Sequence, residues 1–119
     1  MLKSILLVGA GGALGSIARY LISNLMVYFA ICGEVATLAV NVIGSFLIGL
    51  LIPLPGSSGQ LILAVGFCGG FTTFSTFSYQ ALHLFQTGQR LSALIYIISS
   101  VVLSILSALI GIYLSEKFI

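Results

Sequence analysis

Four long apolar segments, separated by short polar connections, constrain this chain more than any other feature. They run over Ser4–Phe29, Ala36–Leu54, Gln60–Phe85 and Leu91–Ser115. Each is close to the ~20 residues that an α-helix needs to cross a bilayer. Charged residues make up 5% of the chain. Because a soluble domain has roughly 25%, the sequence predicts an all-α integral membrane protein, with four transmembrane helices in a single domain of residues 1–119.

The connections between these segments are too short to hold a further domain. The first contains Cys32, Gly33 and Glu34, the second is the turn "PLPGSSG", and the third contains Gly88 and Arg90. A cleaved signal peptide is the alternative for the first segment. We do not favour it, because the apolar run is long and no A-x-A-like cleavage site follows it.

The charges that flank the segments are nearly balanced. Four spans place both termini on one side, with Lys3 and Lys117. The other side has Arg90, joined by Arg19 if that side chain extends outward from the far half of the first span. The positive-inside rule needs a larger bias to fix an orientation. Either one orientation is weakly set, or the chain inserts both ways and pairs as an antiparallel, dual-topology homodimer; we favour the second, because four short helices hardly enclose a pathway alone.

The residues needed for enzyme chemistry are sparse. The only carboxylates are Glu34 in a connection and Glu116 near the C-terminus, and the single histidine, His83, is expected at a helix end or vestibule. Cys32 and Cys68 have no metal-ligand spacing. With no nucleophile–base–orienter set and no acid–base pair, we expect no enzyme. A net charge of +2 without a basic run predicts no nucleic-acid partner.

Polar and small residues recur at four-residue spacing within two spans, which places each set on one helix face. The sets are Asn41, Ser45 and Gly49 in the second span, and Tyr96, Ser100 and Ser104 in the fourth. Close packing of neighbouring helices produces the same pattern. The G-x-x-x-G of Gly11 and Gly15 in the first span is also typical of close packing.

The third span contains "GFCGGFTTFSTF", in which glycines precede four hydroxyl residues. Gly is a poor helix former, and Ser and Thr can bond back to carbonyls and bend a helix. We therefore predict a break at residues 69–73, which needs protein or a cavity around it at membrane depth and can expose carbonyls to ions. Phe74 and Phe77, three residues apart, share a face. Lipid contact or core packing is the ordinary explanation for two Phe in a span, but here the rings share a short segment with a break and four hydroxyl residues.

Three stretches resemble the signatures of the Fluc fluoride channels, also called CrcB-type proteins. They are "GGALGSIARY" (11–20), "TLAVNVIGSFLIG" (37–49) and "GFCGGFTTFSTFSYQ" (66–80). The motifs cover three of the four spans, and length and span count agree over the whole chain. The resemblance implies an antiparallel, dual-topology homodimer in the plasma (inner) membrane of a prokaryotic cell. It also implies passive fluoride export through two pores, with a structural sodium ion at the dimer centre.

The resemblance also assigns roles to residues. The sodium ligands would be backbone carbonyls of Gly69 and Thr72. Arg19 would lie near the wide pore entrance, and Gln80 stands where the family usually has Glu. The side chains that would line the fluoride pores are Asn41, Phe74, Phe77, Tyr96, Ser100 and Ser104.

Two other classes of membrane protein were weighed against this interpretation. A small four-span multidrug exporter would need a carboxylate within a span, usually the first, and this chain has none. A non-transporting membrane scaffold would not require Asn41, Phe74 and Phe77 together. Neutral hydrogen-bond donors and the positive edges of aromatic rings suit a small anion better than either alternative.

Overall fold

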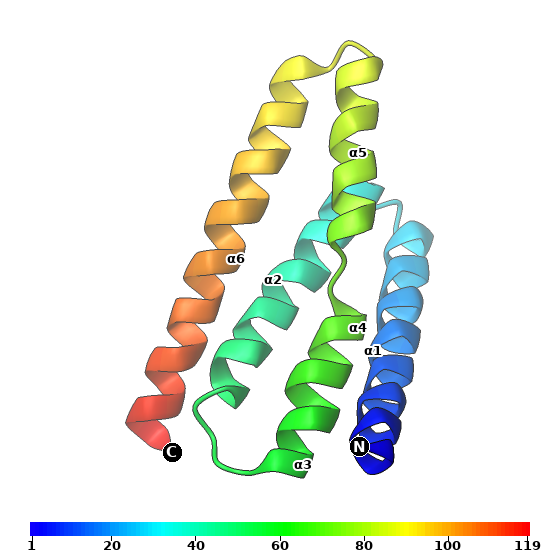
Figure 1. Cartoon of the computed structure of the whole chain (residues 1–119). Helices are drawn as coiled ribbons and strands as arrows, with labels where there is room; N and C mark the ends of the chain where they lie inside the picture. Colours follow the sequence, from blue (N-terminus) through cyan, green and yellow to red (C-terminus); the bar gives the residue numbers. More distant parts are fainter.

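The computed structural model describes residues 1–119 and is helical throughout, with no strand. Figure 1 shows the elements in chain order. They are α1 (Leu2–Tyr28), α2 (Gly33–Leu51), α3 (Ser57–Gly59), the π-helical η1 (Gln60–Cys68), α4 (Gly69–Phe71), α5 (Phe74–Gln86) and α6 (Arg90–Phe118).

Four of the resulting helical stretches are long and apolar enough to cross a membrane, which confirms the four predicted spans. Their bounds are Leu2–Tyr28, Gly33–Leu51, Ser57–Gln86 and Arg90–Phe118. The third stretch is not one continuous helix, because α3, η1 and α4 are separated from α5 by two extended residues. The architecture is that of a multi-pass membrane protein.

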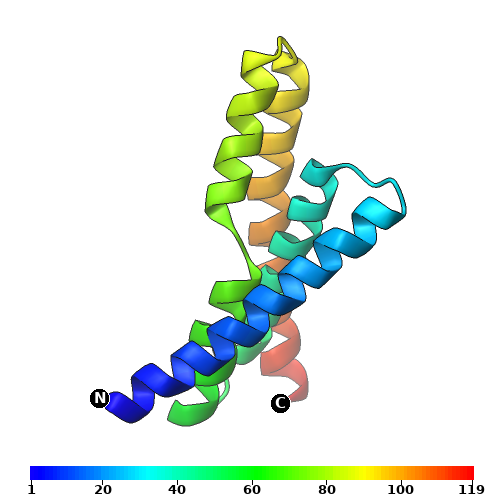
Figure 2. The same cartoon turned by 90° about the vertical axis from the view of Figure 1, so that its right-hand side faces the viewer.

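The two termini lie at the same end of the bundle, as an even number of spans requires (Figure 1). The turn between α2 and α3 is also at that end, and the turn between α5 and α6 is at the other. Figure 2 shows α1 crossing the remaining helices obliquely. Its main contacts are with η1 and α4, whereas α2 packs along α6.

The second helix ends earlier than its apolar pattern suggests. We expected it to reach Leu54, but α2 ends at Leu51. Pro53 has no N–H to continue the helical ladder. The side-chain amide of Gln60 then donates to the carbonyls of Leu51 and Leu54, the second at 2.8 Å. One side chain from η1 therefore adds donors to carbonyls at and just beyond the end of α2, of which that of Leu51 also accepts the N–H of Leu54.

The glycines of α1 allow two backbones to touch. A Cβ atom on Gly11 would overlap the carbonyl oxygen of Ile62, and one on Gly15 would overlap the carbonyl oxygen of Phe67. Both glycines are buried against η1. The close packing predicted from the G-x-x-x-G spacing is therefore confirmed.

A similar contact joins α2 to α6. A Cβ atom on Gly49 would overlap the carbonyl oxygen of Ala108, so Gly49 serves close packing. The hydroxyl of Ser107 donates to the carbonyl of Val42 at 2.8 Å across the same interface. This hydrogen bond fixes the register of the two helices.

Few side chains are enclosed by the chain itself. Only 19 of 119 residues are buried, so most of the apolar surface of the bundle faces outward. Lipid tails are as apolar as leucine, and outward-facing apolar side chains suit that environment. The structure is thus a lipid-facing bundle around small buried clusters.

Candidate functional site

The third span breaks at Thr72 and Thr73. Thr72 has φ −85° and ψ 159°, and Thr73 has φ −148° and ψ 116°, both extended. The prediction of a break is confirmed at these two residues, but it was wrong for the start of the range, because the helix continues through Gly69–Phe71. Gly70 lies against the backbone of Gly12 in α1, so close packing holds this stretch helical despite its glycines.

The threonines at the break cap the helices on either side. The N–H and the hydroxyl of Thr72 both donate to the carbonyl of Cys68, at 3.1 and 2.9 Å. The hydroxyl of Thr73 accepts the N–H of Thr76 at 3.2 Å and so acts as the N-cap of α5. This cap was not predicted from the sequence, although a threonine three residues before a second hydroxyl residue was its visible signal.

Asn41 of α2 pairs with the backbone of the break. Its Oδ1 accepts the N–H of Thr73 at 2.7 Å, and its Nδ2 donates to the carbonyl of the same residue at 3.0 Å. In a continued helix the N–H of Thr73 would reach the carbonyl of Gly69. Asn41 therefore takes the donor that would otherwise close the helix onto Gly69.

Thr72 loses its helical donor in the same way. Its carbonyl would accept the N–H of Thr76 in a continued helix, but that N–H donates to the hydroxyl of Thr73. The carbonyls of Gly69 and Thr72, the two oxygens expected to bind a cation, are thus both deprived of their intrahelical donors. Asn41 accepts the N–H that would reach Gly69, and the hydroxyl of Thr73 accepts the N–H that would reach Thr72.

Arg19 approaches the break from α1. It is partly buried, and its Nε donates to the carbonyl of Gly70 at 3.1 Å. A cation is favourable at the C-terminal end of a helix, where carbonyl groups carry partial negative charge. Because this side chain turns inward to the third span, the flanking charges are Lys3 and Lys117 against Arg90 alone.

A groove of about 500 Å³ opens beside the break, between α2, α6 and both halves of the third span. No Asp, Glu, Lys, Arg or His lines it. Seven of the ten predicted site residues do: Asn41, Gly69, Thr72, Phe74, Phe77, Ser100 and Ser104. Ser45, one turn along α2 from Asn41, lines it as well, as does the buried thiol of Cys68, which the sequence analysis did not place there.

Three aromatic rings lie in a row, of which two line the groove and the third, Tyr96, lies outside it. The rings of Phe74 and Phe77 have centroids 5.5 Å apart, and those of Phe77 and Tyr96 lie 5.2 Å apart. The interplanar angles of 53° and 56° make both pairs tilted and not stacked. Phe74 is 78% exposed, whereas Phe77 is 8% exposed.

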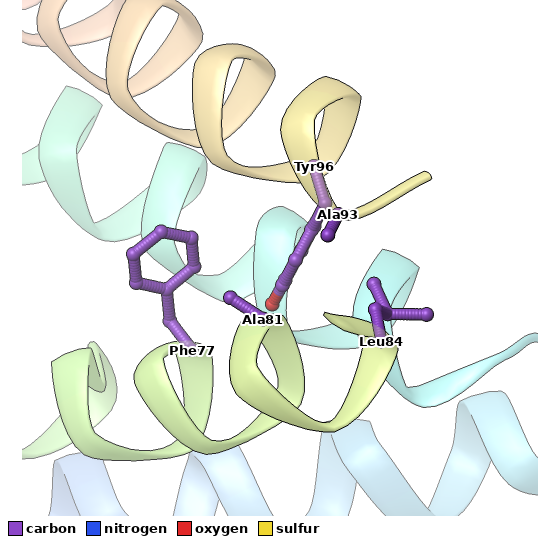
Figure 3. Packing of buried hydrophobic residues seen from close by; sticks show 5 residues of the cluster. All are labelled: Phe77, Ala81, Leu84, Ala93 and Tyr96. Carbon is purple, nitrogen blue, oxygen red and sulfur yellow. The ribbon is translucent and has the colours of Figure 1, made fainter. Parts of the chain in front are cut away.

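Phe77 belongs to a buried cluster between α5 and α6. Figure 3 shows the ring of Phe77 on α5 and that of Tyr96 extending from α6 toward α5. The remaining members of the cluster are Ala81, Leu84 and Ala93. One ring thus packs in the core of the bundle and forms part of the groove wall.

Tyr96 and Gln80 do not line the groove. The hydroxyl of Tyr96 donates to Oε1 of Gln80 at 2.6 Å. Tyr96 instead lines a second pocket of about 620 Å³, together with Cys32, Glu34 and His83. The stripe predicted along α6 is therefore divided between two surroundings. Tyr96 packs against α5, whereas Ser100 and Ser104, further along α6, line the groove.

Ser100 is the buried hydroxyl of the stripe without a partner. It is 6% exposed, lines the groove, and its Oγ makes no hydrogen bond. A buried hydroxyl that lacks a partner costs about 1–3 kcal/mol. Ser115, which does not line the groove, is also buried without a partner, so the unpaired hydroxyl of Ser100 is distinguished by its place in the groove lining.

Comparisons with known proteins identify the family of this chain. Residues 6–112 match the family described as "CrcB-like protein, Camphor Resistance (CrcB)". Relatives named "Fluoride-specific ion channel FluC" include one from Saccharophagus degradans, 42% identical over 96% of this chain and 90% of the relative. One from Gloeothece citriformis is 44% identical over 95% and 97%, and one from Leptospira interrogans is 43% identical over 98% and 97%. The resemblance seen in three sequence motifs is thus confirmed, and the chain belongs to the CrcB-like family.

Proposed function

We propose that this chain is the subunit of a fluoride-selective channel that lets cytoplasmic fluoride leave the cell by passive electrodiffusion and so lowers its toxicity. The relatives that carry the name of a fluoride-specific channel align along nearly the whole chain. The cell membrane involved would be the plasma (inner) membrane of a prokaryote. Hydrogen fluoride enters acidified cells and dissociates inside, so a passive exit for the anion is sufficient.

The chemistry of the groove supports an anion that is small and strongly hydrated. Asn and Ser side chains supply N–H and O–H donors in place of water, and Asn41, Ser100 and Ser104 line the groove. Phe74 and Phe77 add ring edges, which carry partial positive charge. None of these groups holds a full charge, and conduction requires an ion to be released as readily as it is bound.

The single observation that carries the proposal is the orphaned hydroxyl of Ser100. It is buried, it lines the groove, and no protein acceptor satisfies it. An anion that passes along the groove would be the acceptor. The donors that already have partners, such as Asn41 at Thr73, retain one N–H at most for such an ion.

We propose that two copies pair antiparallel and that the pair contains two pores. The near balance of Lys3 and Lys117 against Arg90 supports insertion in both orientations. Phe74, at 78% exposure, and the exposed Gly69 lie at the open side of the groove. A second copy seated there would cover both residues and enclose the groove.

A structural sodium ion between the two copies fits the donors at the break. Gly69 and Thr72 of each copy would hold it with backbone carbonyls, four oxygens in all. Hard cations prefer oxygen ligands, and both carbonyls have lost their helical donors to Asn41 and Thr73. No carboxylate lines the groove, and Ca²⁺ sites usually include carboxylates. When bound, the ion supplies a fixed positive charge that favours anions nearby.

Fluoride selectivity is tested by efflux from proteoliposomes. Vesicles loaded with fluoride and reconstituted with the full chain should empty when an ionophore lets potassium carry the compensating charge. A fluoride electrode records the release, and vesicles without protein provide the control. Chloride efflux at the same rate under the same conditions would refute selectivity.

Dual insertion is tested separately by labelling. A Ser57→Cys variant, made in a background without Cys32 and Cys68, carries one thiol at the exposed start of α3, which lies at the end of the bundle with the termini. A membrane-impermeant maleimide should label it from both faces of intact membranes. Labelling from one face only would reject antiparallel pairing while leaving the selectivity result unaffected.

A further inference from the structure

We propose that Asn41 acts as a clamp that holds the break of the third span open, and that it positions backbone carbonyls in addition to facing the groove. The inference deepens the proposed function, and only its final step, the effect on a cation, rests on that function. It starts from two hydrogen bonds, at 2.7 and 3.0 Å, between one side-chain amide and the N–H and carbonyl of Thr73.

A side-chain amide that meets both backbone groups of one residue replaces one helical hydrogen bond, that of the N–H, and adds a second donor to the carbonyl, which as the N-cap carbonyl also accepts the first bond of α5. The N–H of Thr73 is withdrawn from the carbonyl of Gly69, so the last turn of α4 cannot extend. The carbonyl of Thr73 is held by Nδ2. Asn41 spans 32 residues of sequence to make these bonds, so the break is set by α2 and not by the local sequence alone.

A second contact from α2 keeps the break extended. Gly44 lies one turn along from Asn41, and a Cβ atom there would overlap Cγ2 of Thr72. Thr72 is thus seated against α2 while Asn41 binds Thr73. If Asn41 is removed, the N–H of Thr73 is left without an acceptor, and of these two contacts with α2 only that of Thr72 with Gly44 remains.

Two variants separate a clamp from a simple pore donor. Asn41→Leu keeps similar volume but can neither accept nor donate. Asn41→Asp keeps an acceptor for the N–H of Thr73 but loses the amide donor and adds a negative charge. If Asn41 is only a pore donor, both variants should have the same rate of amide hydrogen exchange at Thr73. If Asn41 is a clamp, the Asp variant should keep the slow exchange of the parent at this amide.

The experiment is hydrogen–deuterium exchange of the purified full chain in nanodiscs, read at the amide of Thr73 in peptides that cover the break. Loss of one hydrogen bond should speed local exchange by about fivefold to tenfold in Asn41→Leu. Asn41→Asp should exchange like the parent although its fluoride flux falls. Ser45→Ala is the matched control, since Ser45 lines the same groove but makes no hydrogen bond to the break.

Unchanged exchange at Thr73 in Asn41→Leu would overturn the clamp, as would equally fast exchange in Asn41→Asp. If the Leu variant does not fold, Asn41→Ala takes its place in the comparison. Thermal unfolding with sodium or with N-methylglucamine forms the second arm, and Asn41→Leu should lose the stabilisation that sodium gives the parent. A parent protein that is indifferent to sodium would refute the cation of the proposed function, and the exchange result would still decide the clamp.

Discussion

Replacing Phe77 with isoleucine removes a ring that contacts two other rings, and Phe74→Ile is its natural counterpart. Phe77 meets Phe74 and Tyr96 at centroid distances of 5.5 and 5.2 Å. A tilted aromatic pair contributes about 0.5–1.5 kcal/mol beyond area burial. Phe77→Ile should therefore lower the free energy of unfolding by about 1–3 kcal/mol, because two such pairs are lost. Phe74→Ile loses one pair, and its exposed ring leaves no cavity within the chain.

The two variants should differ in stability but agree in conduction. If each ring edge contributes about 1.4 kcal/mol to holding the anion in transit, its loss slows fluoride flux about tenfold. Fluoride efflux from proteoliposomes measures the flux, and thermal unfolding with size-exclusion chromatography reports folding and assembly. Both variants should remain assembled. If both conduct like the parent, the rings serve packing alone, and the reasoning about the groove is refuted.

Three further substitutions test other parts of the structure. Gly15→Val places a side chain on the carbonyl of Phe67 and should cost at least about 2 kcal/mol of stability in thermal unfolding, because two backbones must separate; unchanged melting would contradict the close approach. Thr73→Ala removes the N-cap of α5 and should destabilise by about 1 kcal/mol, whereas Thr76→Ala, which leaves the capping N–H in place, should cost less. Ser100→Ala removes the orphaned hydroxyl, so the free energy of unfolding should be unchanged or slightly higher, while fluoride efflux falls. Undiminished efflux would exclude a role for this donor.

The features predicted correctly from the sequence are those that depend on local patterns. Apolar runs determine the four spans because a bilayer demands a fixed length of apolar helix. The spacing of Gly11 and Gly15 predicts close packing because it places two small residues on one helix face. The hydroxyl-rich stretch predicts a break, but glycine propensity placed its start too early, since contact with α1 keeps Gly70 helical.

The features that could not be predicted are contacts between distant segments. Arg19 and Gly70 are 51 residues apart, and Asn41 and Thr73 are 32 apart. The sequence around each of these residues does not indicate which distant residue it contacts. Tyr96 shares helical spacing with Ser100 but faces another pocket, because the element packed against α6 changes along its length.

The central claim, passive conduction of fluoride through a neutral groove, is tested most directly by the reversal potential of the current through a planar bilayer that contains the full chain. With a tenfold fluoride gradient, we expect reversal near the fluoride equilibrium potential, about 59 mV for one charge. The value should stay unchanged when a proton gradient is added, because no Asp, Glu or His lines the groove to couple protons to the anion. It should also stay unchanged when a chloride gradient is added, because the proposed channel is selective for fluoride. A reversal potential that follows chloride, or that shifts with the proton gradient, would contradict the account.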